Sequence, residues 1–324
     1  MQSAYLSILL MITFLSACTG AGDKNSGKQA ADINSEKQYK IAYNVLYDEE
    51  ADDYEIFTMN TDGSEQKNIS NWKGVDWVYY ACKNKIYFVS DRDTTHRVFF
   101  LYEMDVDGEN VRKVTDFRVA DCWISGRNKC TELIVKPHST VDSVFYLINL
   151  KDQGRQIIKP DLAYFHDPCF SPDGKQIVFR GAKERFSGNQ GFDDELYLMN
   201  DDGSGLKQLT EYPESDNTAE WFEYRAGPPV WYQENKISYA SKQDSSYSIF
   251  SINTDGSDLL QLTSTEKSQV YHSWTPDGTK MVFEQSSNDY ENYDIYILDI
   301  ETNSVRQLTD DAIAQQAPVF VMVE

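Results

Sequence analysis

Hydrophobic and polar residues alternate with a period of two in short segments that recur along most of the chain. Four of these segments run directly into an Asp-Gly pair, at Asp62-Gly63, Asp107-Gly108, Asp202-Gly203 and Asp255-Gly256. Two more segments, 145–149 and 295–299, share the alternation but lack the pair. Such alternation is typical of β-strands, and Asp-Gly is typical of the tight turn after a strand. The pattern predicts an all-β protein built from six similar units.

Each predicted unit holds four short strands. One strand follows the alternating segment, and another precedes it; the preceding strands begin at Ile41, Ile86, Leu133, Ile177, Ile237 and Met281, which are 44 to 60 residues apart. A further strand before each of the last five carries one aromatic residue: Tyr80, Trp123, Phe170, Trp231 or Trp274. A repeat of this length with several short strands predicts the four-stranded blade of a β-propeller.

The first unit has no aromatic strand ahead of Ile41. At the other end of the chain, Ala317-Pro318-Val319-Phe320 matches Asp167-Pro168-Cys169-Phe170. We therefore expect the C-terminal segment to supply the innermost strand of the first blade, which would close the ring and protect its edges. The resulting prediction is a six-bladed β-propeller over residues 39–324.

Several motifs carry a family resemblance. Ser171-Pro172-Asp173-Gly174-Lys175, the run Leu196 to Ser204 and the closing Leu209-Thr210 resemble the TolB-type, WD-like propeller repeat. The resemblance covers roughly Gln38 to Glu324 and implies a binding module. The full TolB protein carries an α/β domain before its propeller, where this sequence has only a tether. Functions tied to that domain are not carried over.

The first residues are typical of a targeting signal. Leu6 to Leu15 is an apolar run too short to span a membrane, and Leu15-Ser16-Ala17-Cys18 resembles the lipobox of bacterial lipoproteins. We expect residues 1–18 to be a signal peptide with Cys18 lipidated, and residues 19–38 to be a flexible tether. This predicts a lipid-anchored protein of the bacterial cell envelope, placed by default in the outer membrane facing the periplasm. An ordinary secretory signal with an incidental cysteine is the alternative.

The formal net charge of −22 argues against nucleic-acid binding, because an acidic surface repels phosphate backbones. The expected partner is an envelope protein or a glycan, with membrane attachment only through the lipid, and the expected state is a monomer. No cofactor is predicted. Acidic clusters at residues 48–53 and 289–294 leave calcium open, but they lack the spacing of a calcium-loop motif, and solvated charged hairpins are the favoured explanation.

Candidate binding residues lie on the face opposite the Asp-Gly turns. Two long connections, 181–195 and 211–229, contribute Arg185, Trp221, Tyr224 and Arg225, and the starts of two inner strands contribute His166, Asp167, Tyr271 and His272. Packing of the loop aromatics over the ring is the alternative. No metal site is predicted, because His96 and His138 fall in outer loops and too few histidines remain for a His-rich site.

Four cysteines follow the lipobox. Cys82, Cys122, Cys130 and Cys169 show no Cys-x-x-Cys spacing, which argues against a zinc site. Cys122 and Cys130 flank a predicted hairpin and are the best candidates for a disulfide. Buried free thiols are the alternative.

These features predict an envelope-tethered, non-enzymatic binding or scaffold lipoprotein. The alternative is a polysaccharide lyase or glycoside hydrolase with its site in the propeller channel and Asp167 in acid–base work. No catalytic residue set is predicted, since Gly-x-Ser-x-Gly, P-loop and dinucleotide-binding motifs are all absent from the sequence.

Overall fold

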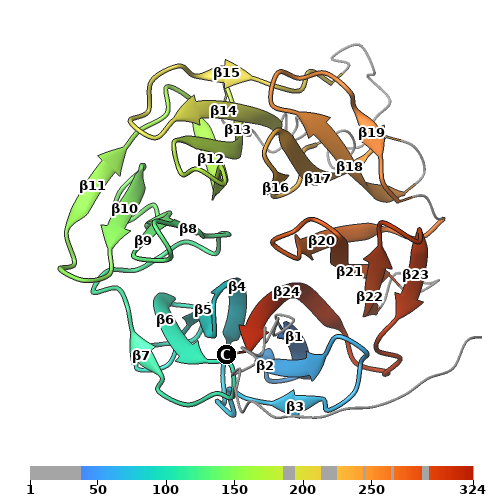
Figure 1. The fold of residues 1–324 in the computed structure, drawn as a ribbon. Helices are drawn as coiled ribbons and strands as arrows, with labels where there is room; N and C mark the ends of the chain where they lie inside the picture. The colour runs from blue at the N-terminus through green and yellow to red at the C-terminus, as the bar shows by residue number, and fades with distance from the viewer. Residues whose placement is uncertain are drawn as a thin grey trace, which may run out of the picture. The chain divides into compact units, whose positions relative to one another are not determined.

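Six four-stranded antiparallel sheets form a ring in the computed structural model (Figure 1). The structure describes residues 38–184, 194–212, 225–243, 246–263, 266–286 and 292–323. Within those ranges, no helix has the length and apolar character needed to span a bilayer. The six-bladed propeller predicted from the repeat is confirmed.

Every blade is ordered from the axis outward, with the innermost strand first. Blade one holds β24 (Gln315–Val323), β1 (Gln38–Asp48), β2 (Asp53–Asn60) and β3 (Lys67–Asn68). Blade two holds β4 (Asp76–Cys82), β5 (Lys85–Ser90), β6 (Phe100–Asp105) and β7 (Arg112–Lys113). Blade three holds β8 (Ser125–Arg127), β9 (Glu132–Val135), β10 (Phe145–Asn149) and β11 (Arg155–Ile158).

The second half of the ring follows the same plan. Blade four holds β12 (Tyr164–Phe170), β13 (Gln176–Ala182), β14 (Glu195–Asn200) and β15 (Lys207–Gln208). Blade five holds β16 (Val230–Gln233), β17 (Lys236–Lys242), β18 (Tyr247–Asn253) and β19 (Leu260–Gln261). Blade six holds β20 (Gln269–Trp274), β21 (Lys280–Ser286), β22 (Tyr293–Asp299) and β23 (Ser304–Gln307).

The C-terminal strand closes the ring, as predicted. β24 pairs antiparallel with β1, and Phe320 lies opposite Ile41 in the register. Figure 1 shows this red strand beside the blue strands of blade one. Because the first blade is built from both ends of the propeller, the ring cannot open without breaking this pairing.

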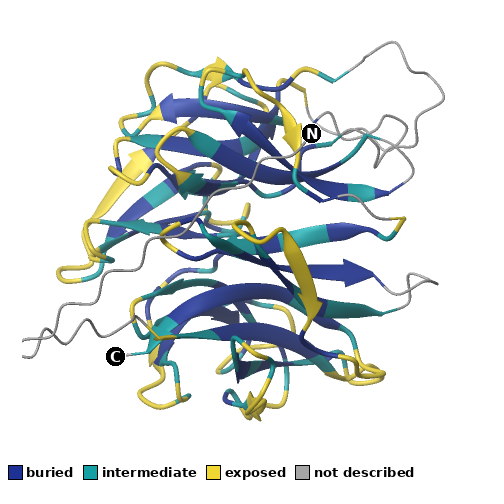
Figure 2. Cartoon of the chain, turned by 45° about the vertical axis from the view of Figure 1, so that its right-hand side comes forward, coloured by how far each residue is buried: buried dark blue, intermediate teal, exposed yellow. Residues whose placement is uncertain are grey.

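Successive residues of one strand point to opposite faces of its sheet, so they pack against different neighbouring blades. Ile41 and Tyr43 lie in one apolar cluster with Val282 and Ile295 of blade six. Ala42, between them in sequence, lies in a second cluster with side chains of blade two. Strands with both faces buried in this way make up the interior, while the outermost strands are largely exposed (Figure 2). The core is therefore a series of apolar layers between neighbouring sheets.

The turns require glycine at the positions that the sequence marks. Gly108 has φ +92°, and a Cβ added there would lie 2.3 Å from the carbonyl oxygen of Ile69 in the adjacent blade. Both the positive φ and the close approach exclude an L side chain without local rearrangement. The Asp-Gly turns thus also pack blade against blade.

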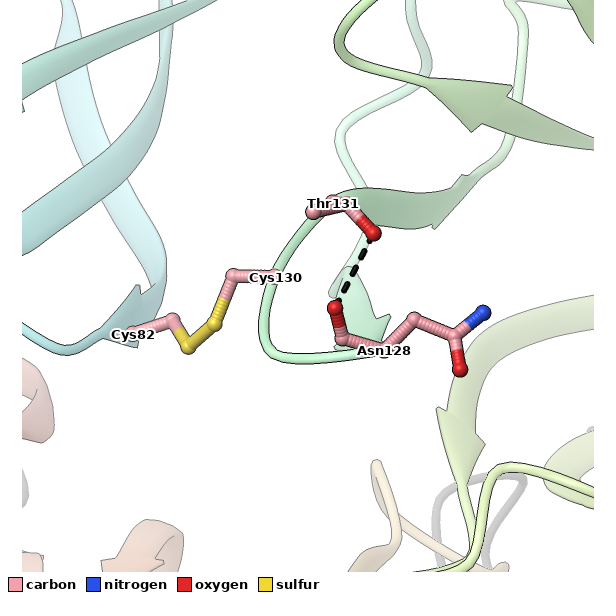
Figure 3. The surroundings of a disulfide bond; sticks show 4 residues. All are labelled: Cys82, Asn128, Cys130 and Thr131. Atoms are coloured by element: carbon pink, nitrogen blue, oxygen red, sulfur yellow. Dashed lines mark hydrogen bonds between the residues drawn. A yellow bond between two sulfur atoms is a disulfide. The ribbon is translucent and has the colours of Figure 1, made fainter.

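One cysteine prediction is wrong. A disulfide joins Cys82 to Cys130 (Figure 3). Cys122 and Cys169 are free. Cys130 lies in the turn after β8, whereas Cys122 precedes β8. The two thiols are therefore at opposite ends of that strand. The end of β4, in the neighbouring blade, brings Cys82 to the turn instead.

Candidate functional site

A cavity of about 420 Å³ lies on the propeller axis. All six inner strands contribute to its wall, mainly through their C-terminal halves and the turns that follow them, for example Cys82-Lys83, Ser171-Pro172 and Thr275-Pro276. It therefore opens on the side of the Asp-Gly turns, opposite the face on which the sequence placed the binding residues. Its volume is in the range of small-ligand and peptide pockets.

Aromatic side chains dominate this axial cavity. They come from five inner strands, from the segment before β8 and from the start of β1: Tyr39, Tyr79, Tyr80, Trp123, Phe170, Trp231, Tyr232, Trp274 and Phe320. Tyr232 and Trp274 stack in parallel with centroids 4.1 Å apart. The inner-strand aromatics predicted from the repeat therefore meet at the axis, and they form a wall suited to apolar or flat ligand groups.

The charges at this cavity differ in sign from the protein as a whole. Lys83 and Arg127 are the charged residues among its lining, although the chain carries a net charge of −22. Arg127 is bonded to Glu132 at 2.7 Å and to Asp201 at 2.5 Å. Lys83 is exposed, and within the described chain it has no ion-pair partner. An anionic group on a ligand would therefore meet Lys83 first.

The inner end of the axial cavity is narrowed by two rings from opposite blades. Trp123 precedes β8 in blade three, Tyr271 belongs to β20 in blade six, and their centroids are 5.5 Å apart. The ring centroids of Tyr79, in blade two, and Trp123 are 5.2 Å apart, and Tyr79 donates its hydroxyl hydrogen to Asp121. Burial and the Asp121 carboxylate raise the pKa of Tyr79, so it stays a phenol at ordinary pH.

Beyond these rings lies a buried polar cluster centred on Asp167. Its carboxylate accepts hydrogen bonds from Arg180 and from the backbone N–H of Trp123 at 2.9 Å. Arg180 also donates to Asp194 at 2.9 Å. Burial alone would raise the pKa of Asp167, but the Arg180 guanidinium and His166 hold it well below its usual range. Asp167 is therefore an ionised positioning group with little capacity to carry a proton.

Two further buried groups next to the axis are held neutral. Burial lowers the pKa of His272 to about 4, and its Nε2 lies 2.7 Å from the Ser238 hydroxyl. Burial raises the pKa of Glu284 to about 8, although the carboxylate accepts the N–H of Ala317 at 2.8 Å. Glu284 could not be identified from the sequence alone, because its partner Ala317 lies on the C-terminal strand, which belongs to blade one.

The predicted binding residues fall into three groups. His166, Asp167 and Tyr271 belong to the polar end of the channel, and His272 lines the axial cavity itself. Arg225 is half-buried, with its guanidinium 5.9 Å from the ring centre of Tyr247. Arg185, Trp221 and Tyr224 lie outside the described residues, as does the lipidation site Cys18. Binding by these residues stays a prediction.

The first acidic cluster is largely engaged within the protein. Asp52 is bound by Arg97 at 2.5 Å and lies 2.8 Å from His96, and the Arg97 hydrogen bond lowers its pKa. Asp53 accepts the backbone N–H of Gly74 at 3.2 Å. In the second cluster, Asp289 and Glu291 are not among the described residues. Calcium binding stays untested at both.

Comparison with known proteins agrees with the geometry. The family described as TolB beta propeller domain matches residues 101–322, well over half of the chain. The chain belongs to the TolB beta-propeller domain family. The six-bladed ring described above is thus a TolB-type propeller.

Solved structures resemble this TolB-type propeller in fold. TolB from Acinetobacter baumannii is 16% identical with a TM-score of 0.65, covering 87% of this chain and 66% of that one. An oligogalacturonate lyase in complex with manganese is 13% identical with a TM-score of 0.50, covering 84% and 74%. Identities this low show the shared fold alone.

A curated relative is similar over a shorter stretch. Dipeptidyl-peptidase 5 of Porphyromonas endodontalis is 28% identical over 114 residues, which is 35% of this chain and 15% of that protein. The TolB-type propeller therefore spans under two thirds of both the Acinetobacter TolB and this peptidase.

Proposed function

We propose that this TolB-type propeller is a non-enzymatic binding module of the bacterial cell envelope, tethered through lipid on Cys18. Its ligand is an extended peptide segment of an envelope partner protein, held in the axial cavity. The observation that carries the proposal is the cavity itself, which all six inner strands line and to which five of them contribute aromatic side chains. The lipobox-like sequence and the TolB family membership support the envelope location.

The chemistry of the wall favours a peptide. Besides its aromatic residues, the cavity is lined by Pro168, Pro172, Pro229 and Pro276. Extended and proline-rich peptides dock into aromatic-lined grooves because their backbone loses little conformational freedom on binding. Lys83 at the mouth adds attraction for an acidic residue.

Pull-down from native envelopes after crosslinking tests the proposal. Tyr232→Ala removes a half-buried ring from the cavity wall, and Tyr47→Ala is the matched control, because Tyr47 is 58% exposed and is not part of the wall. We expect Tyr232→Ala to lose the partner at least tenfold while Tyr47→Ala retains it, both variants melting cooperatively. Capture that survives Tyr232→Ala, or that needs glycan rather than protein in the extract, would contradict it.

The second candidate is a polysaccharide lyase or hydrolase. The likeness to the oligogalacturonate lyase favours it, and the polar cluster at Asp167 would be its site. Opposing it, Asp167 is 2% exposed and is already bound by Arg180. Turnover of an acidic oligosaccharide by purified protein, abolished in Asp167→Asn, would replace the binding proposal with this one.

A further inference from the structure

We propose that Cys122, His166 and Asp167 form a binding site for one divalent transition-metal cation of the zinc class. Cys122 comes from blade three, and His166 and Asp167 come from β12 of blade four. One ligand atom from each of the three side chains lies within 4.8 Å of the other two. The sequence has too few histidines for a His-rich metal site, and it does not reveal that the Cys122 thiol lies close to His166.

One pair of ligand atoms, from His166 and Asp167, is already near ligand spacing, and the Cys122 sulfur lies within 4.8 Å of both. Asp167 donates its backbone N–H to the Cys122 sulfur at 3.2 Å, and His166 Nδ1 lies 3.1 Å from Asp167 Oδ1. Zinc bonds of 2.0–2.3 Å place tetrahedral ligand atoms about 3.3–3.8 Å apart. Small side-chain rotations would therefore bring the site together without moving a strand. Asp167 has φ +54°, an uncommon conformation, and lies at an irregularity of β12 between His166 and Cys169.

Two cationic side chains, Arg180 and Lys136, lie near the site. The Asp194 carboxylate can balance the charge of Arg180. Arg180 bonds both Asp167 and Asp194, so Asp194 can neutralise it when Asp167 turns to a metal. Asp194 Oδ1 is buried without a hydrogen-bond partner among the described residues. Lys136 packs 4.0 Å above the ring of Phe165. The Cys122 thiolate and the Asp167 carboxylate together balance a dication, and the thiol proton leaves to solvent on binding.

The donor set selects the class of metal. A thiolate and an imidazole favour zinc-like cations over calcium or magnesium, which prefer all-oxygen sites. Arg180 on Asp167 and the N–H on the Cys122 sulfur are second-shell contacts of the kind that fix ligand orientation. Three protein ligands leave a fourth position for water or for a group on a bound ligand.

Cobalt(II) titration of the full-length, chelator-treated protein tests this site. We expect one Co²⁺ per chain, a sulfur-to-metal charge-transfer band in the near ultraviolet, and displacement of the cobalt by Zn²⁺. Cys122→Ser should abolish the band, whereas Cys169→Ser, which removes the other free thiol of the described chain, should retain it. His166→Ala and Asp167→Asn should each weaken zinc binding at least tenfold.

The wild-type titration decides the matter even where a variant fails to fold. A wild-type protein that binds no Co²⁺ or Zn²⁺ at micromolar concentration would overturn the site. So would a thiolate band that persists in a folded Cys122→Ser protein. The proposed peptide binding does not depend on this result, because Cys122, His166 and Asp167 are not part of the axial cavity wall.

Discussion

The rings of Trp123 and Tyr271 meet across the propeller axis with centroids 5.5 Å apart, although they come from blades three and six. In a ring of six, these blades face each other, so the pair couples parts of the fold that share no strand pairing (Figure 1). A double-mutant cycle with Trp123→Ala and Tyr271→Ala, measured by urea unfolding, should give a coupling of about 0.5–1.5 kcal/mol. Strict additivity would show that the rings do not interact.

Burial of His272 should make the fold less stable in acid. Its pKa is lowered from 6.5 to about 4 by burial, so the folded state binds its proton less readily than the unfolded chain. The neutral form stabilises the fold above pH 6.5, and this contribution is lost as the pH falls from 6.5 toward 4, up to about 3 kcal/mol. We expect His272→Gln to flatten the pH dependence of unfolding in that window.

Burial of Glu284 should lower the stability of the fold as the pH rises, which is the opposite trend to that expected from His272. Its pKa is raised from 4.5 to about 8 by burial, so the unfolded chain ionises first as the pH rises. The fold is then progressively disfavoured from pH 4.5 to 8, by about 5 kcal/mol at most. Glu284→Gln should therefore gain stability relative to the wild type at pH 8 and not at pH 4. Glu301→Gln, at an exposed position, is the control and should show no such crossover.

The Cys82–Cys130 disulfide predicts a stabilising cross-link between blades two and three. The two residues are 48 positions apart, so the bond closes a long loop in the unfolded chain. Replacing both cysteines with serine should lower the unfolding free energy by about 2–4 kcal/mol. Peptide mapping of unreduced protein should join the peptide containing Cys82 to the one containing Cys130. A mapped link between Cys122 and Cys130 would contradict the structure.

The fold was readable from local sequence because its determinants are local. The Asp-Gly turns fix where strands end, the two-residue period fixes which faces are buried, and an aromatic residue lies in or just before each inner strand. Even the pairing of Phe320 with Ile41 could be predicted, since a missing strand at one end matched an extra one at the other.

The site was harder to predict from the sequence because several residues that meet in it come from different blades. Cys82 meets Cys130, and Cys122 meets Asp167, only once adjacent sheets are packed together. Where the cavity lies along the axis depends on the size of the side chains at the ends of the inner strands. The repeat pattern does not specify those side chains. Arg180 reaches Asp167 within blade four, because β13 pairs with β12 and places Arg180 opposite His166.

Site-specific photocrosslinking in the native envelope tests peptide binding in the axial cavity. A photoreactive phenylalanine analogue replaces Tyr232 in the wall of the axial cavity or, as the control, the exposed Tyr47. We expect an adduct between position 232 and a single peptide segment of an envelope protein, and no such adduct at position 47. An adduct at position 47 with none at position 232, in folded protein, would contradict binding in the axial cavity.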